Sequence, residues 1–338
     1  MTYPRDRAAG RWFPRIAVIL VVAALACVAT PAAAADKEYE GWFAFLDLAS
    51  SQPNSLDQHY ANSEDYTGTP LKRRLTLEND SDMTYRVGVG YGFGKGLGSL
   101  QVSYWSFDND DRESGTVNGG LYPTLFGSTT YYGYSIYLYN SSGVDFRAGS
   151  KTKASTTDLD YIRPITSGDK VSLHWLAGLR VASYEEDVSF EGHDGTNDYF
   201  QAKHLKSDAW GMRVGAGALF SFTDHFGIKS SMVFSFLQAD TKGRSSQTLS
   251  IGSPPSDVAE ADDDNIRGEI RDFDLKAVWS YGHLDYFVGY SMSNWDGLVT
   301  DPVPSSDNSF NGGGASRGRN GISFNSVHAG VKWRFGGS

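Results

Sequence analysis

Ionisable side chains stand at alternate positions inside otherwise apolar segments of this sequence. In "MTYRVGVGYGF", Arg86 lies among glycines, opposite a row of tyrosine, valine and phenylalanine. His174 and Arg180 occupy the same kind of position in "VSLHWLAGLRV". Residues two apart share one face of an extended strand, so these charges gather opposite an apolar face. If the charged face encloses a lumen, its side chains can line a water-filled path or pair with one another.

Thirteen ionisable residues share this position on the face opposite the apolar one. They are Arg86, Asp158, Asp160, His174, Arg180, Arg213, Lys229, Asp274, Lys276, Asp285, His328, Lys332 and Arg334. The set holds seven arginines and lysines against four aspartates. A pore lined by these residues is therefore expected to favour anions mildly.

The elements that must position these residues are β-strands. After the first 35 residues, two-residue alternation recurs along the chain and no segment sustains a helical period of 3.6 residues. The sequence thus predicts an all-β protein. Ten strands are expected, at 39–49, 82–93, 99–108, 155–164, 170–184, 208–221, 225–238, 269–281, 284–295 and 322–335.

The connections between these strands are alternately short and long. The short ones are the polar turns "GKGLG", "TSGD", "TD" and "GH". The long ones are rich in aspartate, serine, asparagine and glycine, which is typical of hydrated loops, and they cover residues 50–81, 109–154, 185–207, 239–268 and 296–321. The sequence therefore predicts an up-and-down antiparallel sheet with five long loops at one end.

The length of the strands indicates that the apolar face contacts lipid. The strands reach roughly 10 to 14 residues, whereas soluble strands usually have ~5 to 6 and about 9 to 11 residues cross a bilayer. Aromatic residues gather near the strand ends, where an interfacial girdle needs them. A secreted β-sandwich with its apolar face inward is the alternative. Because exposed backbone groups are costly in lipid, a membrane-spanning sheet must close into a barrel.

We therefore expect a membrane-spanning antiparallel up-and-down β-barrel of about ten strands, with residues 36–338 as one domain. The segment "TTYYGYSIYLYN" could add a hairpin and raise the number to twelve, but a β-rich flap at the mouth of the barrel is the preferred interpretation. Ten strands lie close to the size at which side chains fill the interior. Inward glycines leave room there, so the sequence leaves an open pore and a salt-bridged plug as alternatives.

The N-terminal segment predicts export. "MTYPRDRAAGRWFPR" carries four arginines and one aspartate, an apolar run extends over residues 16–29, and small residues then lead to Ala35. This pattern is typical of a secretory signal peptide at residues 1–35. A retained anchor and lipidation at Cys27 are the alternatives. Cleavage after Ala35 removes the only cysteine and leaves 26 basic against 39 acidic residues, a net charge of −13. This acidity argues against a nucleic-acid partner.

Enzymatic activity is the least favoured alternative. A ten-stranded barrel with acidic residues and histidine at its rim is similar to the omptin proteases. Rim residues of these types are His193, Asp194, Asp198, Asp296 and Asp301. The paired aspartates and the aspartate–histidine pair of that family do not occur here in recognisable motifs, so we expect ordinary loop residues and no catalytic site. The acidic runs "NDDR" and "DDDN" lack the spacing of a calcium loop, and we expect neither a metal nor a cofactor.

Three segments carry a family resemblance. "TTDLDYIRPITSGDKVSLHWLAGLRVASY" resembles the barrel of the Legionella-type major outer membrane protein family, "WGMRVGAGALFSFTDHFGIKSSMVFSFL" resembles its next hairpin, and "LDYFVGYSMSNWDGL" a late strand. The resemblance extends from about Tyr39 to Phe335. It implies a pore-forming outer-membrane barrel, with some members acting in adhesion. Since Cys27 lies in the predicted signal peptide, the disulfide-linked assembly of some members is not available here.

The chain ends on "SVHAGVKWRFGGS", in which Trp333 and Phe335 share the apolar face. A final strand that ends on an aromatic residue resembles the signal by which the barrel-assembly machinery recognises its clients. Expected partners are this machinery, outer-membrane lipid and lipopolysaccharide. We expect a small pore for passive diffusion of small hydrophilic solutes in the outer membrane of a Gram-negative bacterium. A non-conducting surface barrel with adhesive or structural loops is the alternative.

Overall fold

The structure is a computed structural model. It describes residues 40–54, 58–65, 71–77, 81–94, 96–123, 130–131, 134–135, 138–167, 170–249, 256–303 and 316–335. The predicted signal peptide, including Cys27, lies outside the described residues.

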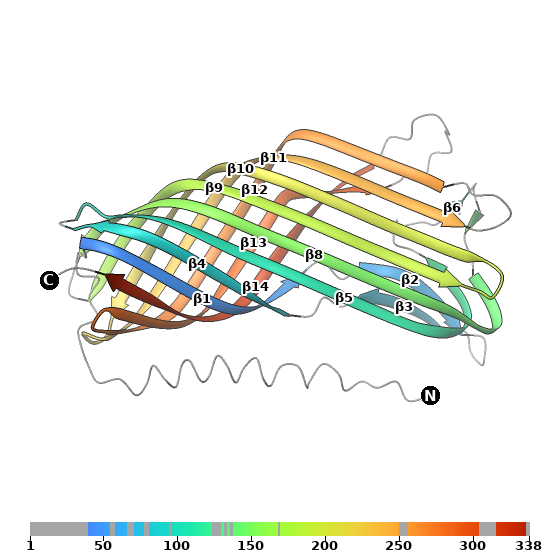
Figure 1. The fold of residues 1–338 in the computed structure, drawn as a ribbon, viewed down its shortest axis with the longest axis horizontal. Helices are drawn as coiled ribbons and strands as arrows, with labels where there is room; N and C mark the ends of the chain where they lie inside the picture. Colours follow the sequence, from blue (N-terminus) through green and yellow to red (C-terminus); the bar gives the residue numbers. More distant parts are fainter. Residues whose placement is uncertain are drawn as a thin grey trace.

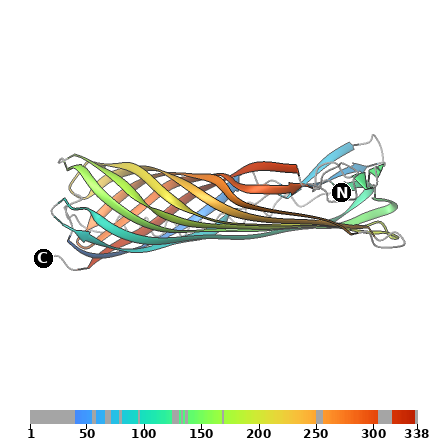
Figure 2. The ribbon, with the colours of Figure 1, turned by 90° about the horizontal axis from the view of Figure 1, so that it is seen from above.

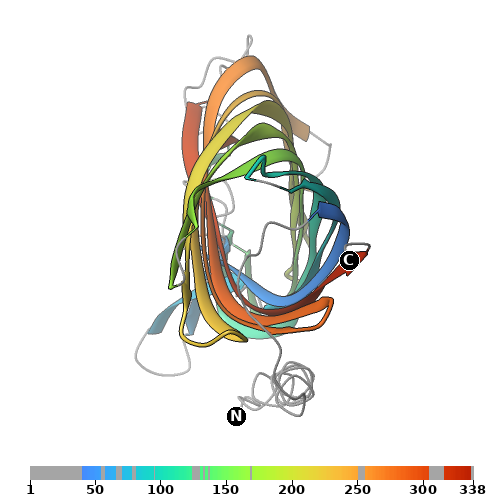
Figure 3. The same cartoon turned by 90° about the vertical axis from the view of Figure 1, so that its left-hand side faces the viewer.

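Ten antiparallel strands close into a barrel (Figure 1), and Figure 3 shows the closed ring end-on. They are β1 (Glu40–Asn54), β4 (Asp82–Phe93), β5 (Ser99–Pro123), β8 (Leu138–Ser167), β9 (Val171–His193), β10 (Asp198–Ser221), β11 (Phe226–Leu249), β12 (Ser256–Tyr281), β13 (Leu284–Val303) and β14 (Ser316–Phe335). Barrel strands that follow one another in the sequence pair with each other, so that β5, for example, pairs with both β4 and β8. The pairing of β1 with β14 closes the barrel. The prediction of ten strands is confirmed.

Four short strands of the described residues lie outside the barrel wall. β2 (Gln58–Asp65) and β3 (Leu71–Leu77) form a hairpin that pairs with the end of β5. β6 (Thr130–Tyr131) and β7 (Tyr134–Ser135) form a separate two-stranded sheet. The segment "TTYYGYSIYLYN" thus supplies β6, β7 and the start of β8, and the alternative of twelve barrel strands is wrong.

The prediction that five long stretches are loops is wrong over much of their length, because barrel strands continue through them. β9 and β10, for example, continue through residues 185–193 and 198–207 and meet at a turn over residues 194–197. In Figure 1 the strands run on from the barrel to the right, and Figure 2 shows this extension narrowing away from the barrel. The error arose because a polar composition indicates only that side chains are hydrated. It does not indicate whether the backbone forms hydrogen bonds to a neighbouring strand. Beyond the apolar part of the strands the β9–β10 and β10–β11 ladders continue in the same register, whereas the β11–β12 and β13–β14 ladders continue after a register shift.

The predicted short turns lie at the other end of the barrel. They join β4 to β5, β8 to β9, β10 to β11 and β12 to β13. In the shortest of them Gly282 has φ +58°, a left-handed conformation that suits glycine, and it joins Tyr281 to Leu284. β1 begins and β14 ends at this same end of the barrel, because Trp42 lies opposite Phe335 in the β1–β14 ladder.

A band of exposed apolar side chains surrounds the barrel on its outer face. On β10 the outward residues Trp210 and Met212 are 62% and 69% exposed, and polar residues begin at Asp208. At the turn end, Trp42 and Trp333 are also exposed. Exposure of this extent is unfavourable in water and favourable against acyl chains. Within the described residues, no helix is long and apolar enough to cross a membrane.

Phe335→Ala is expected to lower the amount of assembled barrel. Phe335 is the last described strand residue, stacks on Trp333 at 4.8 Å between ring centroids, and lies opposite Trp42. The substitution removes the terminal aromatic, which we expect the assembly machinery to recognise. The measurement is the heat-modifiable fraction on cold electrophoresis of outer membranes. Deleting residues 336–338 is the control and should change little; loss of assembly on this deletion would place the signal elsewhere.

Candidate functional site

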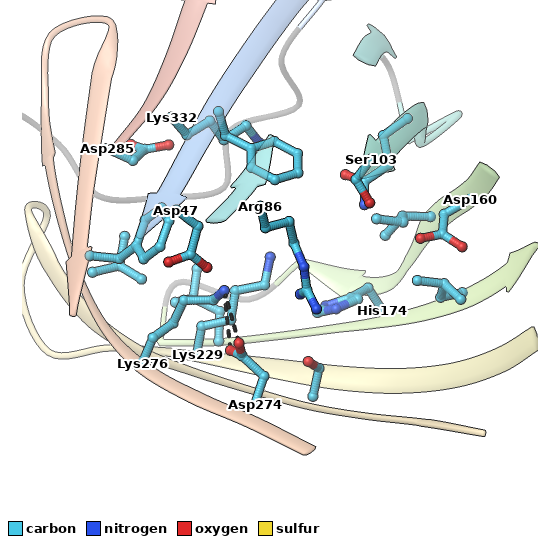
Figure 4. Close-up of a pocket in the computed structure, with 18 of the residues that line it drawn as sticks. Asp47, Arg86, Ser103, Asp160, His174, Lys229, Asp274, Lys276, Asp285 and Lys332 are labelled. Atoms are coloured by element: carbon cyan, nitrogen blue, oxygen red, sulfur yellow. Dashed lines mark hydrogen bonds and ion pairs between the residues drawn. The ribbon is translucent and has the colours of Figure 1, made fainter. Parts of the chain in front are cut away.

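The inward face of the barrel brings most of the predicted lumen residues around one cavity. Eleven of the thirteen line a cavity of about 240 Å³: Arg86, Asp158, Asp160, His174, Arg213, Lys229, Asp274, Lys276, Asp285, Lys332 and Arg334. Figure 4 shows side chains from several strands pointing into it. The remaining two, Arg180 and His328, are 2% exposed and are held in ion pairs with lining residues. The site is thus a charged chamber in the barrel lumen.

Several lining residues were missed by the sequence analysis. Asp47 on β1 and Asp272 on β12 line the cavity, and so do the rings of Phe43, Phe45 and Phe287. Asp272 stands two residues before Asp274, so the same alternation could have found it. The aromatic residues gave no such signal, because large apolar side chains were expected to face lipid.

Rings from neighbouring strands fill the space beside several inward glycines, so this space is not open. A Cβ atom at Gly88 would lie 2.4 Å from the ring of Phe45, and one at Gly90 would lie 2.3 Å from the ring of Phe43. At Gly217 the same position would lie 2.5 Å from the imidazole of His174. Glycine on one strand therefore makes room for a large side chain on the next, and the lumen is narrower than a row of glycines suggests.

A buried ion-pair network closes the chamber on one side. Arg180 Nε and Nη2 donate to the two oxygens of Asp158 at 2.6 and 2.9 Å, and Arg180 Nη1 donates to Asp272 Oδ2 at 2.7 Å. Arg213 contacts Asp158 and donates to Asp160 Oδ2 at 3.2 Å. The side chain of Arg180 is only 1% exposed. Charges this deeply buried are tolerated only because each one is paired.

A second ion cluster lines the wall between β1, β14 and β12. His328 Nδ1 lies 2.9 Å from Asp47 Oδ2, and Nε2 lies 3.5 Å from Asp274 Oδ2. Lys276 Nζ lies 3.1 Å from Asp274 Oδ1 and 4.8 Å from the centre of the Phe287 ring. The imidazole of His328 thus links β14 to β1 and β12, and the ammonium of Lys276 lies over an aromatic ring.

Nearer the turns, charge and aromatic contacts continue on the inward face. Arg334 Nε donates to Asp285 Oδ2 at 3.1 Å, and Ser280 Oγ donates to Asp285 Oδ1 at 2.6 Å. Lys332 Nζ lies 4.2 Å from the centre of the Phe43 ring. The chamber is therefore lined by both charged and aromatic groups along its length.

An aromatic layer crosses the lumen on the extension side of the ion network. The centroid of the Phe324 ring on β14 lies 5.3 Å from that of Trp105 and 5.1 Å from that of Phe107, both on β5. Trp295 on β13 lies 6.2 Å from Trp105 and 5.7 Å from Phe324. Strands β5 and β13 are not neighbours in the wall, so these contacts span the interior. We refer to these four residues as the aromatic layer.

The aromatic layer is tied to the ion network by hydrogen bonds. Trp295 Nε1 donates to Ser293 Oγ at 2.9 Å, and Ser293 Oγ donates to Asp272 Oδ1 at 2.6 Å. Phe107, Trp295 and Phe324 are each 1% exposed. In this conformation the chamber is thus bounded on the extension side first by paired charges and then by packed rings.

The rim residues considered for catalysis lie in separate places. In the β9–β10 turn, His193 Nδ1 lies 2.6 Å from Asp198 Oδ1. Burial raises the pKa of Asp194, but hydrogen bonds from the side chain and backbone of Asn197 and from the Thr196 amide lower it more, and this pKa lies below its usual value. Asp296 lies on β13, 3.6 Å from Arg271. Asp194 therefore has a structural part in closing the turn.

Comparison with known proteins gives a family match over most of the chain. The family model described as Legionella pneumophila major outer membrane protein precursor matches residues 38–334. No curated protein matches the chain.

Several solved structures are similar at low identity. The outer membrane protease OmpT from Escherichia coli is 11% identical, with a TM-score of 0.48 over 90% of this chain and 99% of that chain. The outer membrane protein OprG from Pseudomonas aeruginosa is 12% identical, with a TM-score of 0.32 over 89% and 100% of the two chains. A major outer membrane protein from Thermus thermophilus is 10% identical, with a TM-score of 0.34 over 88% and 100%. Similarity at this level does not bear on function.

Proposed function

This chain belongs to the Legionella pneumophila major outer membrane protein family, and we propose that it acts as a narrow pore through which small hydrophilic solutes diffuse passively. The protein lies in the bacterial outer membrane. The proposal assigns transport to the lumen and no catalytic role to the barrel.

The observation that carries the proposal is the charged chamber in the lumen. A barrel that needed its interior only for stability would gain as much from apolar side chains, since buried ion pairs contribute little net stability. Here charged residues surround a cavity of about 240 Å³. Such a cavity offers water and small ions a polar environment inside the membrane.

A cross-strand pair of lysines supports a mild anion preference. Lys229 on β11 lies directly opposite Lys276 on β12, and both line the cavity. Like charges directly opposite on one face destabilise a sheet. Asp274 contacts Lys276, whereas Lys229 has no ion pair or hydrogen bond to the described part of the chain. A small anion near this pair would relieve the repulsion.

Planar-bilayer recordings of the purified protein test the proposal. We expect discrete openings of small conductance with a mild anion preference, measured as the reversal potential in a salt gradient. Lys229→Glu should shift the reversal potential towards cations, since it inverts one charge in a narrow lumen. Lys206→Glu, which inverts a charge on the outer face, is the matched control and should leave the reversal potential unchanged. The absence of openings at any voltage would exclude a pore, and a cation preference of the unmodified protein would contradict the assigned charge balance.

The aromatic layer favours a second candidate function, a non-conducting surface barrel. Packed rings exclude water, so the aromatic layer would block the passage of ions for as long as its rings stay packed. On this alternative the extension beyond the membrane carries the function, through adhesion or a structural role. The same recordings separate the two candidates.

A further inference from the structure

The outer surface of the extension carries a groove that crosses four strands. Its floor is one row of small residues that lie directly opposite one another in the ladders: Gly149 on β8, Ser189 on β9, Ala202 on β10 and Ser246 on β11. All four residues line a concavity of about 710 Å³, which we call the outer groove. Four strands at a spacing of ~4.8 Å make this floor about 14 Å wide.

Charged rows form the two walls of the outer groove. The row nearer the membrane consists of Lys151, Asp187, His204 and Arg244. The row on the far side contains Arg147 and Glu191, which lie opposite each other. Because both walls point outward from the same face, any occupant of the floor lies between them.

Three cations surround Gly149 at one end of the outer groove. Arg147 and Lys151 flank it on β8, and Arg112 lies opposite it on β5. The Cγ atom of Arg112 is 3.9 Å from the position that a Cβ atom at residue 149 would occupy. Arg112 is paired with Asp110 at 3.0 Å, but Arg147 and Lys151 have no ion pair or hydrogen bond to the described residues. This end of the groove is therefore suited to an anionic group.

The rest of the outer groove is suited to a polar chain. Ser189 and Ser246 offer hydroxyl groups on the floor, and Gly149 and Ala202 leave it shallow and free of bulk. Phe200, 37% exposed, lies opposite Glu191 at the far wall and offers a ring edge. A protein partner would be expected to use large buried anchors, and this floor has no pocket for a side chain of that kind.

The position of the outer groove indicates where its occupant comes from. Ala202 lies eight residues along β10 from Trp210, the last outward aromatic of the apolar band. At about 3.3 Å per residue and a tilt of about 40°, the groove stands roughly 20 Å beyond the edge of the bilayer. That height is occupied by the saccharide part of the outer-leaflet glycolipid, not by its acyl chains.

We propose that the outer groove binds a phosphorylated saccharide of the core region of lipopolysaccharide. A phosphate lies between Arg147, Lys151 and Arg112, and the adjoining sugar units cross Ser189 and Ala202 towards Ser246. Charge-assisted hydrogen bonds from arginine and lysine hold the phosphate. The proposal does not depend on whether the lumen conducts.

The test is calorimetric binding of lipid-free core oligosaccharide to the detergent-solubilised full chain. The phosphorylated oligosaccharide should bind, and Arg147→Glu with Lys151→Glu should weaken it by roughly tenfold or more. Gly149→Phe should weaken it to a similar degree without changing the charge, because the groove is filled; a Cβ atom there meets only ordinary contacts, the nearest at 3.4 Å from Ser189 Oγ. Lys153→Glu, on the same face of β8 but outside the groove, is the matched control and should bind within about twofold of the unmodified protein.

Further arms of this experiment distinguish the source of the anion. The dephosphorylated oligosaccharide should lose most of its affinity, and inorganic phosphate alone should bind far more weakly than the phosphorylated oligosaccharide. The proposal is overturned if the unmodified protein does not bind, if dephosphorylation changes nothing, if inorganic phosphate binds equally well, or if the variants bind like the control. The heat-modifiable fraction of each sample checks folding. Should the double charge variant fail to assemble, Gly149→Phe decides the outcome.

Discussion

Replacing Trp295 and Phe324 together with alanine is expected to raise the single-channel conductance of this barrel about threefold. These two rings, with Trp105 and Phe107, form the aromatic layer across the lumen. The chamber behind them is lined by charge, so the packed rings are the least hydrated part of the path. Removing two of them should let water connect the chamber to the extension side.

The conductance measurement needs a control for the loss of aromatic residues in general. Trp210→Ala removes a tryptophan from the lipid face, where it is 62% exposed, and should leave conductance unchanged. Replacing a buried aromatic residue with alanine lowers the free energy of unfolding by about 3–5 kcal/mol. The milder variant Trp295→Leu is therefore recorded as well, and the heat-modifiable fraction of each sample shows whether the barrel has folded. A double variant that folds and conducts no better than the unmodified protein would mean that the aromatic layer is not the constriction.

Arg180→Met is expected to lower the free energy of unfolding by about 3–5 kcal/mol, because the buried carboxylates of Asp158 and Asp272 lose their main partner and are left to share Arg213. Arg180 makes three hydrogen bonds to Asp158 and Asp272. The Asp158 side chain is only 4% exposed, so water cannot replace the lost contacts. Arg213 retains its contacts with Asp158 and Asp160, so the barrel should still assemble. The measurement is the urea midpoint of the folded barrel in detergent.

Two further variants show whether charge is the cause. Combining Arg180→Met with Asp158→Asn and Asp272→Asn removes the excess buried negative charge and should restore much of the lost stability. Arg271→Met removes an arginine that is 48% exposed, and its effect should stay below about 1 kcal/mol. If the triple variant were as unstable as Arg180→Met alone, the loss would come from packing instead of from buried charge.

The alternation in the sequence was sufficient to predict the membrane-spanning part of the fold. β4 has the predicted bounds of 82–93, and the other nine predicted strands match the membrane halves of the observed ones. Alternation is informative there because lipid on one side and water or charge on the other impose opposite requirements on successive residues. Beyond the membrane both faces of the strands are polar, the contrast is lost, and residues such as 185–193 were predicted as loop although they continue β9.

The sequence predicted which face of the sheet the candidate site residues occupy, but not which of them contact one another. Arg180 and Asp158 were both expected to point inward, and in the structure they lie opposite each other in the β8–β9 ladder. Asp272 reaches Arg180 from β12, three strands further along the wall. A contact of this kind depends on the tilt and flattening of the closed barrel, which no local pattern encodes.

What the sequence determined by itself is therefore the class of protein, the number of spanning strands and the face on which each charge lies, because a two-residue period follows from local backbone geometry. The tertiary structure decided whether the lumen is open along its length. Gly88 and Gly90 look like space in the sequence, but rings from β1 fill that space. Trp105 and Trp295, 190 residues apart, meet across the interior. Such contacts arise only when the sheet closes and brings opposite walls within reach of a side chain.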